Sequence, residues 1–341
     1  MPAPAHTAAH TAAHTAAHTP ARTPAPTPSS RRWWWTALQL LLLGALFVFI
    51  AREVSTQRAA LRVAASSIEV RWLYIAAASA IVLVTYAALI QSWRVLMSGW
   101  GSTISFGTAV RIWTIANLGR YIPGKVWSVG ALVVLAQREG ANSVAAAGAA
   151  LLGTGINIGA GMGVVALSGT AVLNVLGAQY AVVAAVGSVL FLLGVLALPW
   201  LLPWLLSLLA TRRPALEPPS QPLPNSAIWL SVTINVLSWV GYGAAFALLA
   251  RGVLPDISGA LPTFVAIWTA SYLVGYLFLV APGGIGARET ALVGAMVALG
   301  VAVSADAAVL AAVSRLWLIV LEVLPGLVSL ALAPGARKIR S

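Results

Sequence analysis

The sequence contains no cysteine and very few charged residues. The absence of cysteine excludes disulfides, thiolate metal sites and cysteine nucleophiles. Charged residues make up 8% of the 341 positions, against about 25% in an ordinary soluble domain. Apolar residues make up 60%, and the mean hydropathy is +0.91. A soluble fold of this length has too little interior to bury so much apolar surface, so we predict a polytopic membrane protein.

Histidine is missing from most of the chain as well. All four histidines lie in residues 1–32, a low-complexity tail of Ala, His, Thr and Pro, at His6, His10, His14 and His18. We expect this tail to be disordered, because it has little to bury. The spacing of four could place imidazoles on one helix face for a metal ion, but the prolines that follow oppose a continuous helix. The rest of the chain has no imidazole, and we predict no cofactor and no metal site.

The few charges present are mostly positive, with 20 Lys+Arg against 8 Asp+Glu and a net charge of +12. In a soluble protein this excess would suggest a nucleic-acid partner. Here most basic residues lie between or inside apolar segments, so we expect no nucleic acid and interpret them by the positive-inside bias of membrane proteins.

The basic loops also predict an orientation. They place the N-terminus, the 94–111 region, the Pro-rich loop 211–226 and the basic tail 335–341 in the cytoplasm, with the protein in the plasma membrane. The arginines of loop 52–71 conflict with this scheme, which puts that loop outside.

Apolar segments of about 20 residues predict membrane-spanning helices. We therefore predict an all-α transmembrane bundle over residues 33–334. Two Pro-Gly-broken segments leave the count open: six spans if both are re-entrant, and eight if 262–281 and 286–303 both cross. The six are 33–51, 72–97, 143–168, 180–209, 226–250 and 306–333.

The two broken segments share one order of residues. Each begins with Ile-Trp-Thr, at 112–114 and at 267–269, and continues to a Pro-Gly break followed by a cation. Proline removes a backbone donor and glycine permits unusual dihedrals, so each break frees backbone groups that protein, water or ligand must satisfy. Paired breaks in two halves are typical of a transport site, and we predict an inverted repeat. The alternative is an ordinary Pro-Gly turn in a loop.

Charges in or beside apolar segments supply the other candidate residues, because each is costly within the membrane and normally faces a cavity or a partner. Cations exceed anions among them, which suits an anionic headgroup such as a phosphate. The alternative is snorkelling at segment ends, which we expect for Arg111 and Arg138. The predicted substrate-binding set is Arg120, Pro123, Gly124, Lys125, Pro282, Gly283, Gly284, Arg288, Glu289, Arg315 and Glu322. We predict no catalytic residue.

Arg315 and Glu322 are seven residues apart and therefore lie on one helix face. Because two turns separate them, we expect them to pair with other segments and not with each other. The small-residue run 153–163 predicts a close approach of helices. It is not a phosphate loop, because no Lys-Ser/Thr follows it.

The motifs Leu118–Trp127 and Pro282–Glu289 resemble the signatures of the lysylphosphatidylglycerol synthase transmembrane region, a flippase-like family of bacterial and archaeal integral membrane proteins. The resemblance covers roughly residues 33–333. It implies a membrane domain that moves aminoacylated phosphatidylglycerol between leaflets, while a separate soluble domain makes that lipid. Since the chain stops at 341, we expect a stand-alone flippase-like protein without the synthase activity.

The leading hypothesis is therefore translocation of an anionic or aminoacylated phospholipid, or of a polyprenyl-linked lipid, with membrane phospholipid as the partner. One alternative is a non-catalytic membrane partner of an envelope lipid synthase or glycosyltransferase. Another is a membrane-embedded lipid-modifying enzyme, for which the body offers only glutamates and isolated aspartates as acid or base. No oligomeric state follows from the sequence.

Overall fold

The part of the chain that the structure describes consists of helices and their connections, which confirms the predicted all-α fold. The structure is a computed structural model, and it describes residues 70–121, 126–168, 221–277 and 286–332, with isolated positions between 182 and 204. These residues belong to one unit of the chain, residues 42–341. The predicted tails, the predicted spans 33–51 and 180–209, most of the loop 211–226 and both Pro-Gly breaks lie outside the described residues.

Four long helices form the body of the described bundle: α3 (Trp72–Gly99), α6 (Ser143–Ser168), α9 (Asn225–Val253) and α12 (Ser304–Ala331). They contain 26 to 29 residues each, and about 20 are enough to cross the hydrocarbon core. All four are apolar enough to span a membrane. They coincide with four of the predicted spans, at 72–97, 143–168, 226–250 and 306–333.

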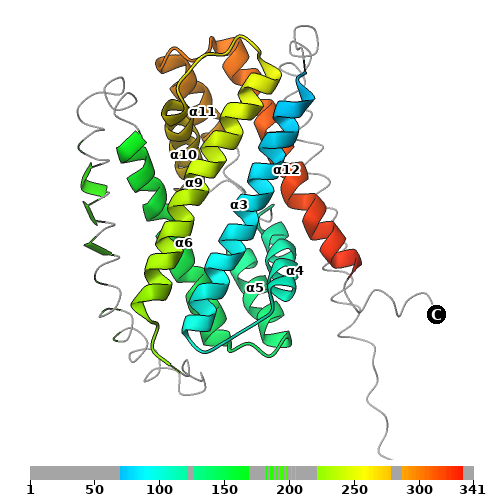
Figure 1. The fold of residues 1–341 in the computed structure, drawn as a ribbon, viewed down its shortest axis with the longest axis vertical. Helices are drawn as coiled ribbons and strands as arrows, with labels where there is room; N and C mark the ends of the chain where they lie inside the picture. Colours follow the sequence, from blue (N-terminus) through cyan, green and yellow to red (C-terminus); the bar gives the residue numbers. More distant parts are fainter. Residues whose placement is uncertain are drawn as a thin grey trace, which may run out of the picture. The chain divides into compact units, whose positions relative to one another are not determined.

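The remaining helices are shorter and form two pairs, one on either side of each Pro-Gly break. The first pair is α4 (Phe106–Asn117), extended by the 3₁₀ turn η1 (Leu118–Tyr121), with α5 (Val126–Arg138). The second pair is α10 (Leu261–Leu277) with α11 (Ala287–Ala298). The two helices of each pair pack against each other, and the pairs lie toward opposite ends of the bundle (Figure 1). An inverted repeat requires its two short-helix pairs to lie toward opposite ends of the bundle, as they do here. The number of membrane spans stays a prediction.

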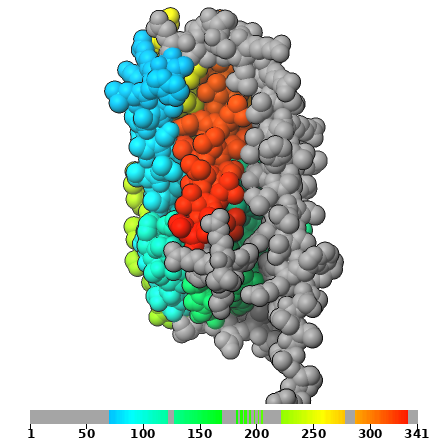
Figure 2. All heavy atoms as spheres, turned by 90° about the vertical axis from the view of Figure 1, so that its right-hand side faces the viewer, coloured from blue at the N-terminus to red at the C-terminus, as the bar shows by residue number. Residues whose placement is uncertain are grey.

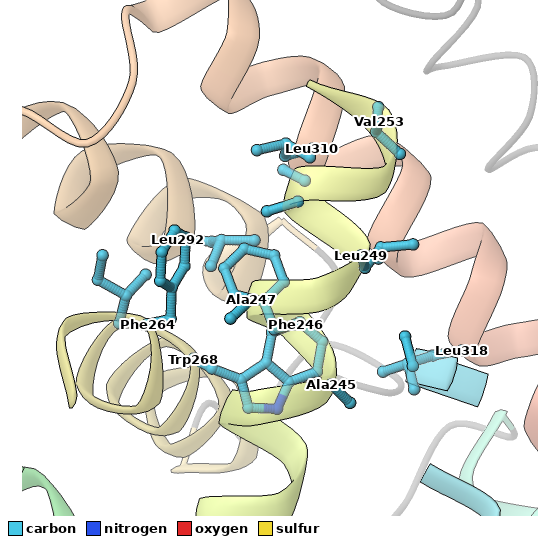
Figure 3. Close-up of a cluster of buried hydrophobic side chains, with 14 of the residues drawn as sticks. Ala245, Phe246, Ala247, Leu249, Val253, Phe264, Trp268, Leu292, Leu310 and Leu318 are labelled. Carbon is cyan, nitrogen blue, oxygen red and sulfur yellow. The ribbon is translucent and has the colours of Figure 1, made fainter. Parts of the chain in front are cut away.

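Each short pair has its own apolar core. Around α10 and α11, Phe246 of α9 stacks on Trp268 with ring centroids 4.8 Å apart, and Leu292 and Leu310 close the cluster (Figure 3). Around α4 and α5, a second cluster is built on Trp100 and residues of α3 and α6. Residues of both clusters, such as Leu318 and Leu132, line the cavity described below.

Contact between α9 and α10 depends on a glycine. A Cβ atom at Gly243 would lie 2.4 Å from the backbone Cα of Val265, closer than real atoms approach. Without a hydrophobic force between membrane helices, association depends on such close packing of backbones at small residues. Gly243 therefore sets the distance at which Trp268 meets Phe246.

Replacement of Gly243 by alanine should lower the thermal stability of the detergent-solubilised protein, since overpacking costs about 1–3 kcal/mol. Gly163→Ala is the matched control, because a Cβ there meets nothing within 4 Å and alanine favours a helix over glycine. Thermal unfolding, with size-exclusion chromatography as the readout, should give a lower midpoint temperature for Gly243→Ala than for the unmodified protein. The midpoint for Gly163→Ala should be equal or higher. Equal midpoints would show that α9 and α10 do not depend on this contact.

Candidate functional site

The centre of the site is the carboxylate of Glu322, which α12 carries into the bundle with 7% of the residue exposed. Its Oε1 accepts a hydrogen bond from the Tyr86 hydroxyl at 2.8 Å and from Arg120 Nη1 at 2.6 Å. Its Oε2 accepts one from the Tyr121 hydroxyl at 2.6 Å. Hydrogen bonds to a charged group are short and about twice as strong as neutral ones. Glu322 thus joins α12 to α3 and to the η1 turn.

Arg120 extends this cluster toward α10. Its Nη1 also donates to the hydroxyl of Tyr272 at 3.3 Å, and its side chain is partly exposed to the cavity described below. The first Pro-Gly-broken segment therefore contributes a cation that a carboxylate neutralises.

Arg288 is held differently and is more deeply buried than Arg120. It lies in the first turn of α11, where the positive end of the helix dipole does not favour a cation. Its guanidinium lies over the ring of Trp268 at 4.5 Å and the ring of Tyr272 at 4.8 Å from the centroids. Only 4% of the residue is exposed, and Nη2 has no hydrogen-bond partner within the described ranges. Cation–π contacts stabilise this charge without neutralising it.

Glu289 and Arg315 form the third charged contact. Arg315 Nη1 lies 3.6 Å from Glu289 Oε1, while Glu289 Oε2 accepts from the backbone N–H of Gly286 at 2.8 Å. Gly286 has a φ of 81°, a value that suits glycine, and the Glu289 side chain caps the start of α11 through this backbone hydrogen bond. Arg315 and Glu322 thus pair with residues of other segments, as their spacing predicted.

These charges surround a cavity of about 530 Å³ between the helices, within the usual range for ligand pockets. Its charged lining is Arg120, Arg288, Arg315 and Glu322. Aromatic rings form another part of the wall: Tyr86, Trp113, Tyr121, Trp239, Tyr242 and Tyr272. The cavity therefore combines a cationic side with an amphipathic aromatic side.

The charges in this region do not balance. Glu322 is paired with Arg120 and Glu289 with Arg315, so Arg288 is the arginine of the cavity with no ion pair among the residues described. Arg120 and Arg288 both contact Tyr272, so two like charges lie near one ring. A buried, uncompensated cation costs several kcal/mol, and an anion in the cavity would relieve that cost.

Mid-span amides form a polar wall that the sequence analysis missed. Asn157 of α6 donates to Asn235 Oδ1 of α9 at 2.8 Å, and Asn235 donates to Ser92 Oγ of α3 at 3.1 Å. Trp239 Nε1 donates to the Asn157 carbonyl at 2.8 Å. Asn157 and Asn235 both line the cavity. The available signal was an asparagine inside the small-residue run 153–163, which we interpreted only as a packing feature.

Other predicted residues lie elsewhere. Pro123, Gly124, Lys125, Pro282, Gly283 and Gly284 lie outside the described residues. Arg111 forms an ion pair with Glu139, and its side chain is partly exposed, as expected of a cation at a segment end. Within the described ranges, no group of three or more His, Asp or Glu residues could hold a metal ion.

Removal of the Glu322 carboxylate tests the cluster. Glu322→Ala leaves Arg120 without its carboxylate, and breaking a buried pair costs about 3–5 kcal/mol. Glu139→Ala removes an exposed pair with Arg111, which is worth about 0–1 kcal/mol. Thermal unfolding of the solubilised protein should therefore show a much larger loss for the first variant, and similar losses would contradict the role given to Glu322.

The family comparison agrees with this architecture. A family model described as "Lysylphosphatidylglycerol synthase TM region" matches residues 36–326. No curated protein matches the chain. The matched range includes both Pro-Gly segments and every helix described above, apart from the last five residues of α12. The chain therefore belongs to the family of the lysylphosphatidylglycerol synthase transmembrane region and is a multi-pass integral membrane protein.

Proposed function

We propose that this protein binds the anionic headgroup of a membrane lipid in the arginine cavity and moves that lipid between leaflets. The observation that carries the proposal is Arg288, a buried guanidinium at the cavity wall that has no carboxylate partner in the described part of the chain. The cargo is an anionic or aminoacylated phospholipid or a polyprenyl-linked lipid, and the protein lies in the plasma membrane with both termini in the cytoplasm.

A phosphate is the anion that this arrangement suits. The planar guanidinium of arginine can donate two parallel hydrogen bonds to phosphate oxygens. Arg288 Nη2 has no hydrogen-bond partner among the residues that the structure describes, and Arg120 and Arg315 line the same cavity. Three arginines with two carboxylates close by give a positive site whose net charge one phosphate can neutralise.

Movement between leaflets is supported by where the arginines come from. Arg120 follows α4 and Arg288 begins α11, so each short-helix pair supplies one cation to one cavity. The pairs lie toward opposite ends of the bundle (Figure 1). In transporters with inverted repeats, a central site becomes accessible from either side as one repeat moves against the other. The role of the cavity is then binding and transfer, with no chemical step.

Substitution of Arg288 tests the proposal. In vesicles of phosphatidylcholine and phosphatidylglycerol, transfer of fluorescent phosphatidylglycerol can be followed by dithionite reduction of the outer-leaflet label. Loss of a charge-assisted contact worth about 1.5–3 kcal/mol predicts a fall of about tenfold or more for Arg288→Ala. Arg288→Lys should retain part of the rate, because lysine keeps the charge but loses the two-pronged geometry.

Arg251→Ala is the matched control. Arg251 also lies over an aromatic ring, that of Phe264, at 5.6 Å, but it does not line the cavity. The Arg251→Ala variant should transfer phosphatidylglycerol at the same rate as the unmodified protein. An unchanged rate in Arg288→Ala, or no transfer by the unmodified protein, would contradict the proposed function.

A further inference from the structure

A second, smaller cavity of about 130 Å³ adjoins the arginine cavity. It lies between α3, α4 and α12, and we call it the α3–α4–α12 cleft. Tyr86, Trp113, Asn117 and Glu322 line both cavities. The two spaces are therefore neighbours across one shared wall, in which the Tyr86 hydroxyl donates to Glu322.

Away from this shared wall the cleft is apolar. Its remaining lining is Leu83, Ala87, Ile90, Phe106, Val110, Thr114, Leu321 and Pro325. Two of these residues reach the outside of the bundle, since Leu83 is 45% exposed and Phe106 42% exposed. Because α3 is long and apolar enough to span a membrane, this outer end of the cleft faces the lipid region.

The backbone explains why the helices leave a space here. Pro325 lies inside α12, where proline removes a backbone donor and its ring crowds the preceding turn. One residue on, α12 is in tight contact with α4 and η1, because a Cβ at Gly326 would lie 3.0 Å from the carbonyl oxygen of Thr114 and 2.9 Å from Leu118 Cδ2. Thr114 Oγ1 also donates to Ser329 Oγ at 2.9 Å. These contacts close the cleft at one end.

At the other end the backbones of α3 and α12 approach each other closely at few points. The two helices run side by side on the face shown in Figure 2, whereas α12 packs closely on α4. One side-chain hydrogen bond crosses the seam, from Trp317 Nε1 to Ser79 Oγ at 2.9 Å. The cleft thus follows a weakly packed seam from the bundle surface to the polar wall around Glu322.

We propose that the α3–α4–α12 cleft holds the start of a hydrocarbon chain of the same lipid whose headgroup lies in the arginine cavity. The inference rests on the proposed function. Three observations identify the occupant: the apolar lining, the wall shared with a cationic cavity, and the exposed outer end on membrane-spanning helices. A free anion could bind to the arginines, but it has no apolar part that could occupy the cleft.

The size of the cleft limits what it holds. A cavity of about 150 Å³ binds benzene, so about 130 Å³ accommodates a few methylene groups. The cleft therefore holds the part of the chain nearest the headgroup, and the rest of the chain stays in the bilayer. The glycerol or phosphate junction of the lipid lies beside Tyr86 and Glu322.

Photocrosslinking tests this placement with the full-length protein in vesicles. The probe is phosphatidylglycerol with a diazirine on an acyl-chain carbon near the ester, diluted in phosphatidylcholine. Peptide mapping should place adducts on Leu83, Val110 and Leu321, one on each helix of the cleft. Ala87→Trp fills the cleft and should reduce these adducts at least fivefold, whereas Ala80→Trp, an exposed position on α3 that lines neither cavity, should leave them unchanged.

Other outcomes separate this inference from the proposed function. Adducts confined to another helix seam, together with normal transfer that Arg288→Ala abolishes, would overturn the cleft and leave the headgroup site standing. Binding of glycerol phosphate as tight as that of the lipid, with no adducts in the cleft, would overturn both the tail site and a lipid cargo. Adducts in the unmodified protein support the inference even if Ala87→Trp does not fold.

Discussion

The described bundle depends on one buried carboxylate. Glu322 is surrounded by apolar helices, and its two oxygens accept three hydrogen bonds from side chains of α3 and η1. A buried charge is tolerable only when its partners satisfy it this fully. Replacing both partners of a buried ion pair with apolar residues is often neutral for stability, whereas removing one partner is costly. The main role of Glu322 is therefore to position its partners. It fixes Arg120 at the edge of the large cavity and Tyr86 in the wall between the two cavities.

Arg288 shows the contrasting way of burying a cation. The rings of Trp268 and Tyr272 hold its guanidinium without neutralising it, and α11 presents it at the unfavourable end of the helix dipole. Neither feature neutralises the positive charge of Arg288, so this charge can still interact with an anion. The positive charge of Arg120 is instead compensated by Glu322. Tyr272 contacts both arginines. The site therefore has two cations with carboxylate partners, Arg120 and Arg315, and one that has no such partner in the described part of the chain. An exchangeable anion requires this arrangement.

The long helices and part of the charged set followed from the sequence. Hydropathy alone predicts α3, α6, α9 and α12, because a membrane span needs only length and apolar character. Periodicity predicts that Arg315 and Glu322 pair elsewhere. The aromatic partners were not predictable in this way: Tyr86 and Tyr272 in an apolar helix look like any interfacial or packed ring, and only the tertiary contact shows what each one holds. Trp268 entered the sequence argument only as part of a repeated triplet.

The wall shared by the two cavities could not be predicted from the sequence either. Tyr86 and Asn117 come from the consecutive helices α3 and α4, whereas Glu322 lies 236 residues beyond Tyr86 on α12. Nothing in their local pattern distinguishes them from other polar residues in spans. A lipid has a charged end and an apolar end joined within a few atoms, so its binding site needs a sharp change from cationic to apolar lining over the same distance. A hydroxyl and a carboxylate bonded to each other provide that change, because their polar groups satisfy one another while the tyrosine ring and the helix faces beyond them stay apolar. The carboxylate that neutralises Arg120 is thus also part of the boundary that would orient a lipid between the two cavities.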